Sequence, residues 1–135
     1  CGHDQDEGTF TIALAVALKK LDFAVSFYTN PDPNIDEKEK QSYIDAQRLN
    51  IPIHAALTYS EIQQAFENGH FVIVFYDTLH GVGNQSLIYS IDEQEISFCD
   101  HFEAMSKSTF EQQRQADGIC RQVIVVEQYS EFYPI

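Results

Sequence analysis

Apolar residues recur with two different periods along this chain, and each period predicts a different kind of element. Over residues 9–23, apolar side chains fill several consecutive helical turns, which predicts a helix that is buried almost all round, with Thr9 as its N-cap. Short β-rich apolar runs dominate the middle of the chain, at residues 72–76, 87–91 and 96–98. They predict an antiparallel meander whose last two strands are joined by a tight turn.

Two capping boxes predict where the later helices begin. A compact helix is expected over residues 57–69, with a capping box at residues 60–63 and a C-terminal cap at Gly69. A second capping box at residues 108–111 opens another helix, which is expected to end at Gly118.

The remaining segments complete the expected fold. A polar helix is expected over residues 36–49, and short strands are expected at residues 23–28, 51–55 and 120–128. Helices therefore come first and a mainly antiparallel sheet follows, which is an α+β plan. The chain has 135 residues, so we expect a single domain over residues 1–135.

The chain is strongly acidic, with a formal net charge of −13 and only eight lysine and arginine residues. Nucleic-acid binding needs clustered basic side chains, so this balance argues against nucleic acid as a partner and against an anionic membrane surface. A basic partner is compatible with the charge. No apolar run approaches the roughly 20 residues that cross a bilayer, so membrane insertion is not expected.

The three cysteines, Cys1, Cys99 and Cys120, are widely spaced and show no metal-ligand pattern. We therefore expect no metal and no cofactor. Cys99 and Cys120 fall in expected strands, where an isolated cysteine is commonly a small buried hydrophobe. Reduced thiols are compatible with a cytoplasmic setting. The chain opens at Cys1 without an initiator methionine, so we expect a fragment or a processed product.

Four local strings follow one another in a particular order. They are ENGHFVIVFYD for a first strand, GNQSLIYSID for a second, ISFCD for a third, and MSKSTFE for the helix that follows. With the buried N-terminal helix in front of them, these strings resemble the C39-like cysteine peptidases, a branch of the papain-like superfamily. The resemblance covers most of the chain. It implies a C39-like fold, in which an N-terminal buried helix and a helical region pack on a mainly antiparallel sheet.

In that family a Cys-Gly pair opens the first helix, a His begins the second strand and an Asp ends the third. The resemblance places Asp100 at the Asp position, but Asn84 stands at the His position and Glu7 at the Cys position. Thiol catalysis needs a cysteine and an imidazole base, which neither Asn84 nor Glu7 supplies. The resemblance therefore implies a degenerate, non-catalytic site with Gly83 and Gln85 as binding residues. Taken singly, the same residues also suit ordinary turns and strand ends.

Two alternatives retain an active thiol. In the first, Cys1 is the nucleophile and His80 is the base, although the carboxylates at residues 4, 6 and 7 would raise the pKa of that thiol. In the second, His70 is the base and Asp92 orients it. We place both behind the inactive interpretation.

Three functions follow from these observations. The leading hypothesis is a catalytically inactive C39-like domain that binds a polypeptide or protein partner, with an acidic rim that favours a basic segment. The first alternative is an active thiol hydrolase or peptidase that uses Cys1 with His80 or His70. The second alternative is a structural or regulatory subunit that makes its contact through the aromatic tail at residues 129–135.

Overall fold

The computed structural model describes residues 10–32, 35–77, 83–116 and 119–127, without the side chains of residues 101 and 102. Over these residues the chain has a mixed α+β fold, as expected. The helices are α1 (Thr11–Lys20), α2 (Glu37–Arg48), α3 (Tyr59–Glu67) and α4 (Lys107–Arg114). The strands are β1 (Ala24–Thr29), β2 (Ile53–Ala55), β3 (Phe71–Asp77), β4 (Gly83–Ile91), β5 (Glu95–Phe98), β6 (His101–Ser106) and β7 (Val123–Glu127). None of the described helices has the length and apolar character needed to cross a membrane.

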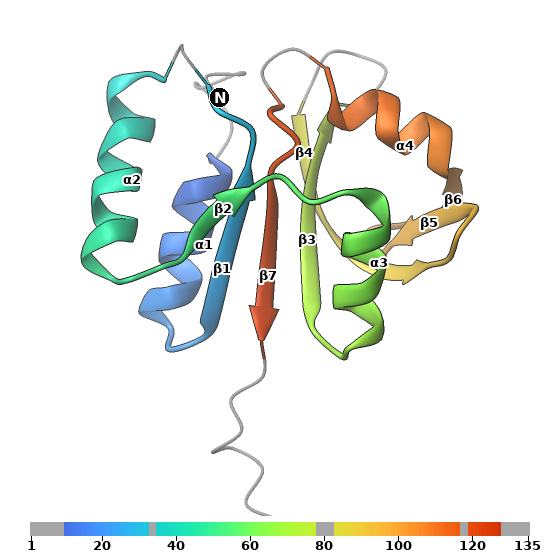
Figure 1. Ribbon diagram of the computed structural model, residues 1–135, viewed down its shortest axis with the longest axis horizontal. Helices are drawn as coiled ribbons and strands as arrows, with labels where there is room; N and C mark the ends of the chain where they lie inside the picture. Colours follow the sequence, from blue (N-terminus) through green and yellow to red (C-terminus); the bar gives the residue numbers. More distant parts are fainter. Residues whose placement is uncertain (1–9, 33–34, 78–82, 117–118, 128–135) are drawn as a thin grey trace, which may run out of the picture.

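The seven strands form one sheet with the order β2-β1-β7-β3-β4-β5-β6 (Figure 1). Strands β1 and β2 are parallel and the other neighbouring pairs are antiparallel, which confirms the expected, mainly antiparallel sheet. The expected strands at residues 23–28 and 51–55 are β1 and β2, and since they belong to the same sheet as the later strands, the helices do not simply precede the sheet. Strand β1 follows α1 directly and pairs with β7, whose run of buried Val and Ile side chains requires neighbouring strands on both edges.

Two pairs of helices cover the two faces of the sheet (Figure 1). Helices α1 and α2 pack on one face, where Ile12 meets Phe27 of β1 and Ile124 of β7. Helices α3 and α4 pack on the opposite face, where Ile62 belongs to the same core as Val125 of β7. Successive residues of a strand point to opposite faces, so β7 contributes to both cores.

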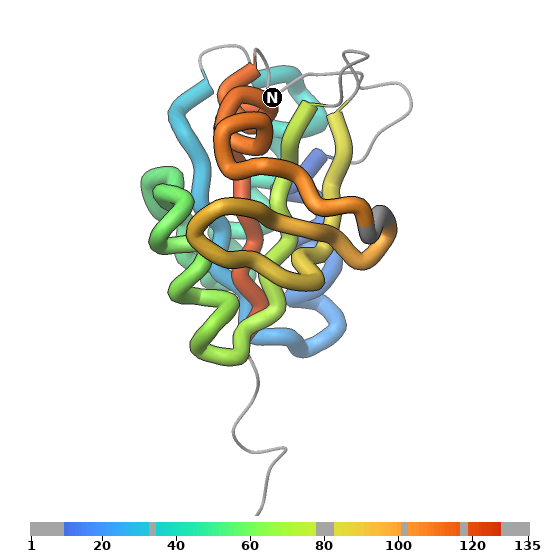
Figure 2. Tube along the Cα trace, turned by 90° about the vertical axis from the view of Figure 1, so that its right-hand side faces the viewer, coloured from blue at the N-terminus to red at the C-terminus, as the bar shows by residue number. Residues whose placement is uncertain are grey.

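The far side of the sheet bends away from the central strands. Strands β5 and β6 run across the direction of β3 and β7 (Figure 2), and the β4–β5 ladder is irregular between Ile88 and Ser90. An irregularity of this kind increases the local twist of a strand. The sequence did not predict β6, whose residues were expected to lead into the last helix. They instead pair with β5 at one edge of the sheet.

Helix α3 begins two residues before the predicted capping box. Thr58 is the N-cap: its hydroxyl accepts from the backbone N–H of Glu61, and the Glu61 carboxylate accepts from the N–H of Thr58. The predicted cap at Ser60 was therefore wrong. The helix starts at Tyr59 because this side chain is buried and donates its hydroxyl to the carbonyl oxygen of Asp92.

Helix α4 shows the same displacement. The hydroxyl of Ser106 accepts from the N–H of Thr109 and caps the helix, so the predicted cap at Ser108 was wrong. With the helix starting at Lys107, the side chain of Phe110 lies in the core that α4 shares with α3. The predicted end at Gly118 lies outside the described residues.

Helix α1 keeps one side exposed to solvent, so the expectation of burial almost all round was wrong. Ile12 and Ala15 are fully buried, whereas Ala17 is exposed. The sheet and α2 cover the helix on two sides and leave the remaining side to solvent. The predicted cap at Thr9 lies outside the described residues.

Candidate functional site

Polar side chains gather at one end of the sheet, where strands β1 and β3 end and strands β4 and β7 begin. Helix α1 begins at the same end of the sheet (Figure 1). The predicted residues Gly83, Asn84 and Gln85 open β4 and pair with the last residues of β3, so they are strand residues rather than turn residues. Asp100 lies just beyond the end of β5, which pairs with β4.

Asn84 and Asp100 are joined through Ser86. The Ser86 hydroxyl donates to Oδ2 of Asp100 at 3.1 Å, and Nδ2 of Asn84 donates to Oγ of Ser86 at 3.1 Å. Asn84 also donates to the Tyr76 hydroxyl at 3.0 Å, and that hydroxyl lies 3.0 Å from Oγ of Ser86. Tyr76 stacks on the ring of Phe98, with 4.9 Å between the ring centroids. The network therefore runs from the buried core out to the exposed carboxylate of Asp100.

Gln85 makes its contact on the opposite face of β4. Its Nε2 donates to Oγ1 of Thr11 at 3.0 Å. Thr11 is the first residue of α1 and is buried. Adjacent residues of a strand point to opposite faces, so the start of the first helix meets β4 at Gln85, while Asn84 belongs to the other face.

These groups supply hydrogen bonds rather than thiol chemistry. The Thr11 hydroxyl meets an amide donor, and an activated nucleophile instead needs a base beside it. The amides of Asn84 and Gln85 donate and accept hydrogen bonds but do not take up a proton at neutral pH. In its described part, the meeting point of α1 and β4 therefore supplies hydrogen-bonding groups.

Asp77 adds a hydrogen-bond acceptor at the same end of the sheet. It is the last residue of β3 and pairs across the ladder with Gly83. Its Oδ1 atom is buried, and the described residues offer it no hydrogen-bond partner. An unpartnered buried oxygen is costly, so a donor brought by a bound molecule would be stabilised here.

The alternative base His70 lies elsewhere in the fold. It directly precedes β3, at the opposite end of that strand from Asp77, and lines a pocket of about 280 Å³ with residues of α3, β1 and β7. Its suggested partner Asp92 lies in the β4–β5 turn, where two backbone N–H groups donate to the carboxylate and lower its pKa. The other predicted site residues and the C-terminal tail lie outside the described residues: Cys1, Glu7, His80 and residues 129–135.

Neither described cysteine matches its prediction. Cys99 is a free, exposed thiol in the turn between β5 and β6. Cys120 is disulfide-bonded and lies in the turn before β7, with a left-handed φ of 56° that does not suit a strand. The expectation of two buried, reduced thiols in strands was therefore wrong. Since Cys99 is free, the partner of Cys120 lies outside the described residues.

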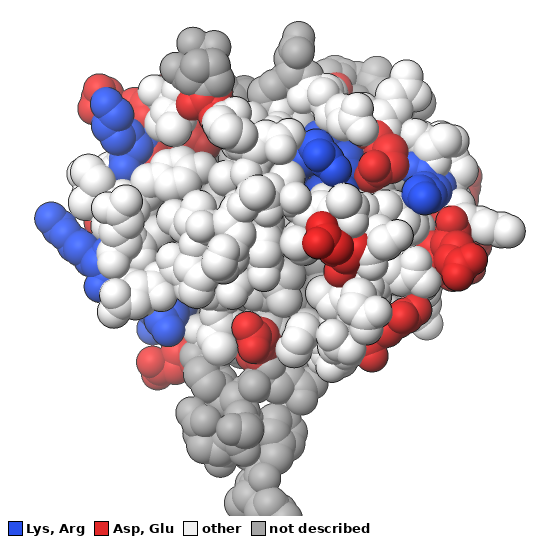
Figure 3. All heavy atoms as spheres, in the orientation of Figure 1, with Lys and Arg blue, Asp and Glu red and all other residues white. Residues whose placement is uncertain are grey.

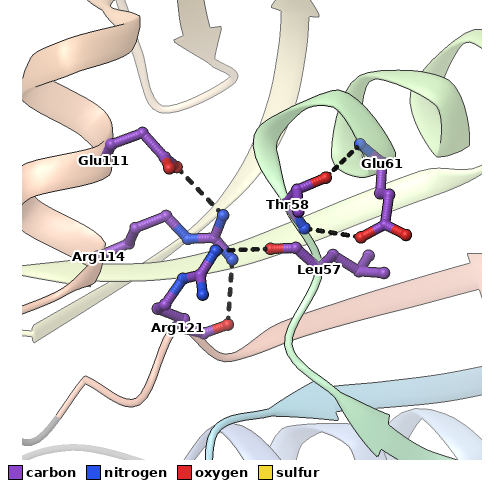
Figure 4. Close-up of polar contacts among 6 residues, drawn as sticks. All are labelled: Leu57, Thr58, Glu61, Glu111, Arg114 and Arg121. Carbon is purple, nitrogen blue, oxygen red and sulfur yellow. Dashed lines mark hydrogen bonds and ion pairs between the residues drawn. The ribbon is translucent and has the colours of Figure 1, made fainter.

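A second polar cluster lies between the end of α4 and the start of β7 (Figure 4). Fully buried Arg114 donates to Oε1 of Glu111 at 3.2 Å and to the carbonyl oxygen of Arg121 at 3.2 Å. Arg121 donates to the carbonyl oxygen of Leu57, directly before the cap of α3, at 3.3 Å. Burial lowers the pKa of Arg114, while Glu111 acts in the opposite direction.

The two arginines were not among the site residues predicted from the sequence. Their only signal was that two of the eight basic residues flank the turn between the last helix and the last strand. On the face shown in Figure 3, basic side chains lie along the α2 edge and in a small group on the α4 side, while acidic side chains are more widely scattered. Two adjacent arginines thus form a local positive group in a chain whose net charge is strongly negative.

Within the described part of the chain, no group of three or more His, Cys, Asp and Glu side chains is arranged to hold a metal ion. Comparisons of the chain with protein-family models, with curated proteins and with solved structures found no match.

Proposed function

We propose that this chain is a non-catalytic domain of C39-like, papain-like architecture that binds a polypeptide. The observation that carries the proposal is the hydrogen bond between Gln85 and Thr11. It joins the start of α1 to the start of β4. The resemblance places the nucleophile at Glu7, four residues before Thr11, and the base at Asn84, which is next to Gln85 but on the other face of β4. A glutamine and a threonine at this junction supply neither group.

This end of the sheet suits an extended peptide. A peptide unit presents one donor and one acceptor, which a side-chain amide such as that of Gln85 can complement. Asp77 and Asp100 add carboxylates at the same end of the sheet. Their negative charge favours a segment that carries lysine or arginine, in line with the net charge of the chain.

Titration of the isotope-labelled chain with peptides of one length tests this proposal. The peptides are a basic, a neutral and an acidic version of an otherwise similar extended sequence. We expect the basic version to shift the backbone amide resonances of residues 83–86 and Thr11 saturably, and to bind more weakly as salt is added. The peptide should remain intact after long incubation, as judged by its mass.

Two glutamine variants provide a matched comparison. Gln85→Ala removes an amide at the proposed site and should weaken binding by roughly fivefold, the equivalent of about 1 kcal/mol for one hydrogen bond. Gln41→Ala removes an exposed amide of α2, which contacts Asp45, and should leave binding unchanged. Failure of all three peptides to bind, or equal effects of both variants, would refute the proposed site.

The alternatives give other results. Cleavage of the peptide would contradict a non-catalytic domain. The thiol hydrolase that uses Cys1 with His80 or His70 also requires a free Cys1 thiol, and Cys1 is the one cysteine left to pair with Cys120 when Cys99 is free. The position of His70 does not favour it as the base, because His70 lies at the start of β3 and α1 begins at the opposite end of the sheet. A structural or regulatory subunit that uses residues 129–135 stays a prediction, since that tail lies outside the described residues.

A further inference from the structure

The pair Arg114 and Arg121 lines an open pocket of about 410 Å³, a size typical of pockets for small ligands. Asn30, Gln115 and Cys120 complete its described lining. The pocket lies where β1 and α4 end and β7 begins. None of these residues takes part in the proposed peptide site, so the two sites stand independently.

Several donors of the arginine pair are unused by the described residues. A guanidinium carries five N–H donors. Arg114 uses two in its bonds to Glu111 and to the carbonyl oxygen of Arg121, and Arg121 uses one in its bond to Leu57. The Nε atom of Arg121 is buried, and the described residues provide no acceptor for it.

The local charge is also incompletely balanced. Figure 4 shows the two guanidinium groups next to each other, with the carboxylate of Glu111 on the side of Arg114. The charge of Arg121 disfavours the charged form of Arg114, and Glu111 favours it. Within the described part of the chain, two positive groups thus lie beside one carboxylate, that of Glu111, which is bound to Arg114.

We propose that this pocket binds an oxyanion, either a carboxylate or a phosphate group, at the guanidinium of Arg121, with the buried guanidinium of Arg114 beside it adding positive charge. A planar guanidinium matches the oxygen atoms of such a group with paired hydrogen bonds. The anion satisfies the buried Nε of Arg121 and neutralises the excess positive charge. The contacts to Glu111 and Leu57 hold both arginines in place before the anion arrives, which reduces the entropic cost of binding.

Titration of the full chain with inorganic phosphate, with acetate and with potassium chloride at matched ionic strength tests the proposal. The signals to follow are the arginine side-chain Nε–H resonances and the backbone amides of Asn30 and Cys120. We expect phosphate or acetate to shift them saturably and chloride not to do so. A short peptide with a free C-terminal carboxylate, compared with its amidated form, distinguishes a chain terminus from a free anion as the source of the group.

Arginine variants locate the binding. Arg121→Gln should raise the dissociation constant roughly tenfold or more, because it removes charge-assisted hydrogen bonds. Arg121→Lys keeps the charge but loses the planar group, so an intermediate loss is expected. Arg48→Gln, at the exposed end of α2, should have no effect.

Three outcomes overturn the proposal: no saturable shift with phosphate, acetate or the carboxylate peptide; an equal response to chloride; or an unchanged affinity in Arg121→Gln. The titration of the unaltered chain remains decisive if that variant fails to fold.

Discussion

Ser86 holds together the polar network at the start of β4. Its hydroxyl lies within 3.1 Å of side-chain atoms of Tyr76, Asn84 and Asp100. Ser86 and Tyr76 are both buried, so the groups that contact this hydroxyl have little access to other partners. A buried polar group that loses its partner costs roughly 1–3 kcal/mol. The position of Asn84 and Asp100 therefore depends on a residue whose importance the sequence did not indicate.

Ser86→Ala should lower the free energy of unfolding by about 1–3 kcal/mol, because it leaves the Tyr76 hydroxyl and the Asn84 amide with fewer partners in a buried place. Urea denaturation measures the change. Ser42→Ala is the control, since the Ser42 hydroxyl makes only an exposed contact to the Lys38 carbonyl oxygen within α2. Equal losses in the two variants would mean that the network adds nothing to stability.

At the scale of elements, the caps of the helices give a direct test of where they begin. Thr58→Ala removes the capping hydroxyl of α3 and should lower the free energy of unfolding by about 1 kcal/mol. Ser60→Ala changes an exposed residue inside the helix and should be neutral or slightly stabilising, because alanine has the higher helix propensity. A larger loss for Ser60→Ala than for Thr58→Ala would place the start of α3 at the box predicted from the sequence.

The sequence predicted those elements whose pattern is local. The apolar runs of β3, β4 and β7 and the polar helix α2 lie close to their expected positions. Both N-caps lie two residues before the predicted positions. Packing in the core explains this shift, because the observed starts of α3 and α4 bury Tyr59 and Phe110. Strand β6 was missed because its residues lack an apolar run and gain their partner only from β5 at the edge of the sheet.

The candidate site was predictable only in part for the same reason. The hairpin between β4 and β5 was expected, and it brings Asp100 to the same side of β4 as Asn84. The partner of Gln85 lies 74 residues away in α1, so that contact depends on how the helix packs on the sheet. Arg121 could not be assigned to a pocket from sequence because its turn has a left-handed backbone, with φ of 50°, where no glycine signals it.

At the scale of the whole molecule, the disulfide of Cys120 is a covalent constraint. It anchors the turn that precedes β7, the strand that contributes to both cores. The disulfide corrects the expectation that Cys120 is a reduced thiol. A structural disulfide typically contributes 2–5 kcal/mol in a small domain, about as much as losing several of the hydrogen bonds described above.

Alkylation of the full chain with iodoacetamide, followed by peptide mass analysis, should therefore label Cys99 and leave Cys120 unmodified until a reductant is added. Reduction should also lower the free energy of unfolding by about 2–5 kcal/mol, because the unfolded chain regains the freedom that the cross-link removed. A Cys99→Ser variant should lose the exposed thiol and keep the same sensitivity to reduction, which separates the two cysteines. Labelling of Cys120 without reductant would contradict the disulfide.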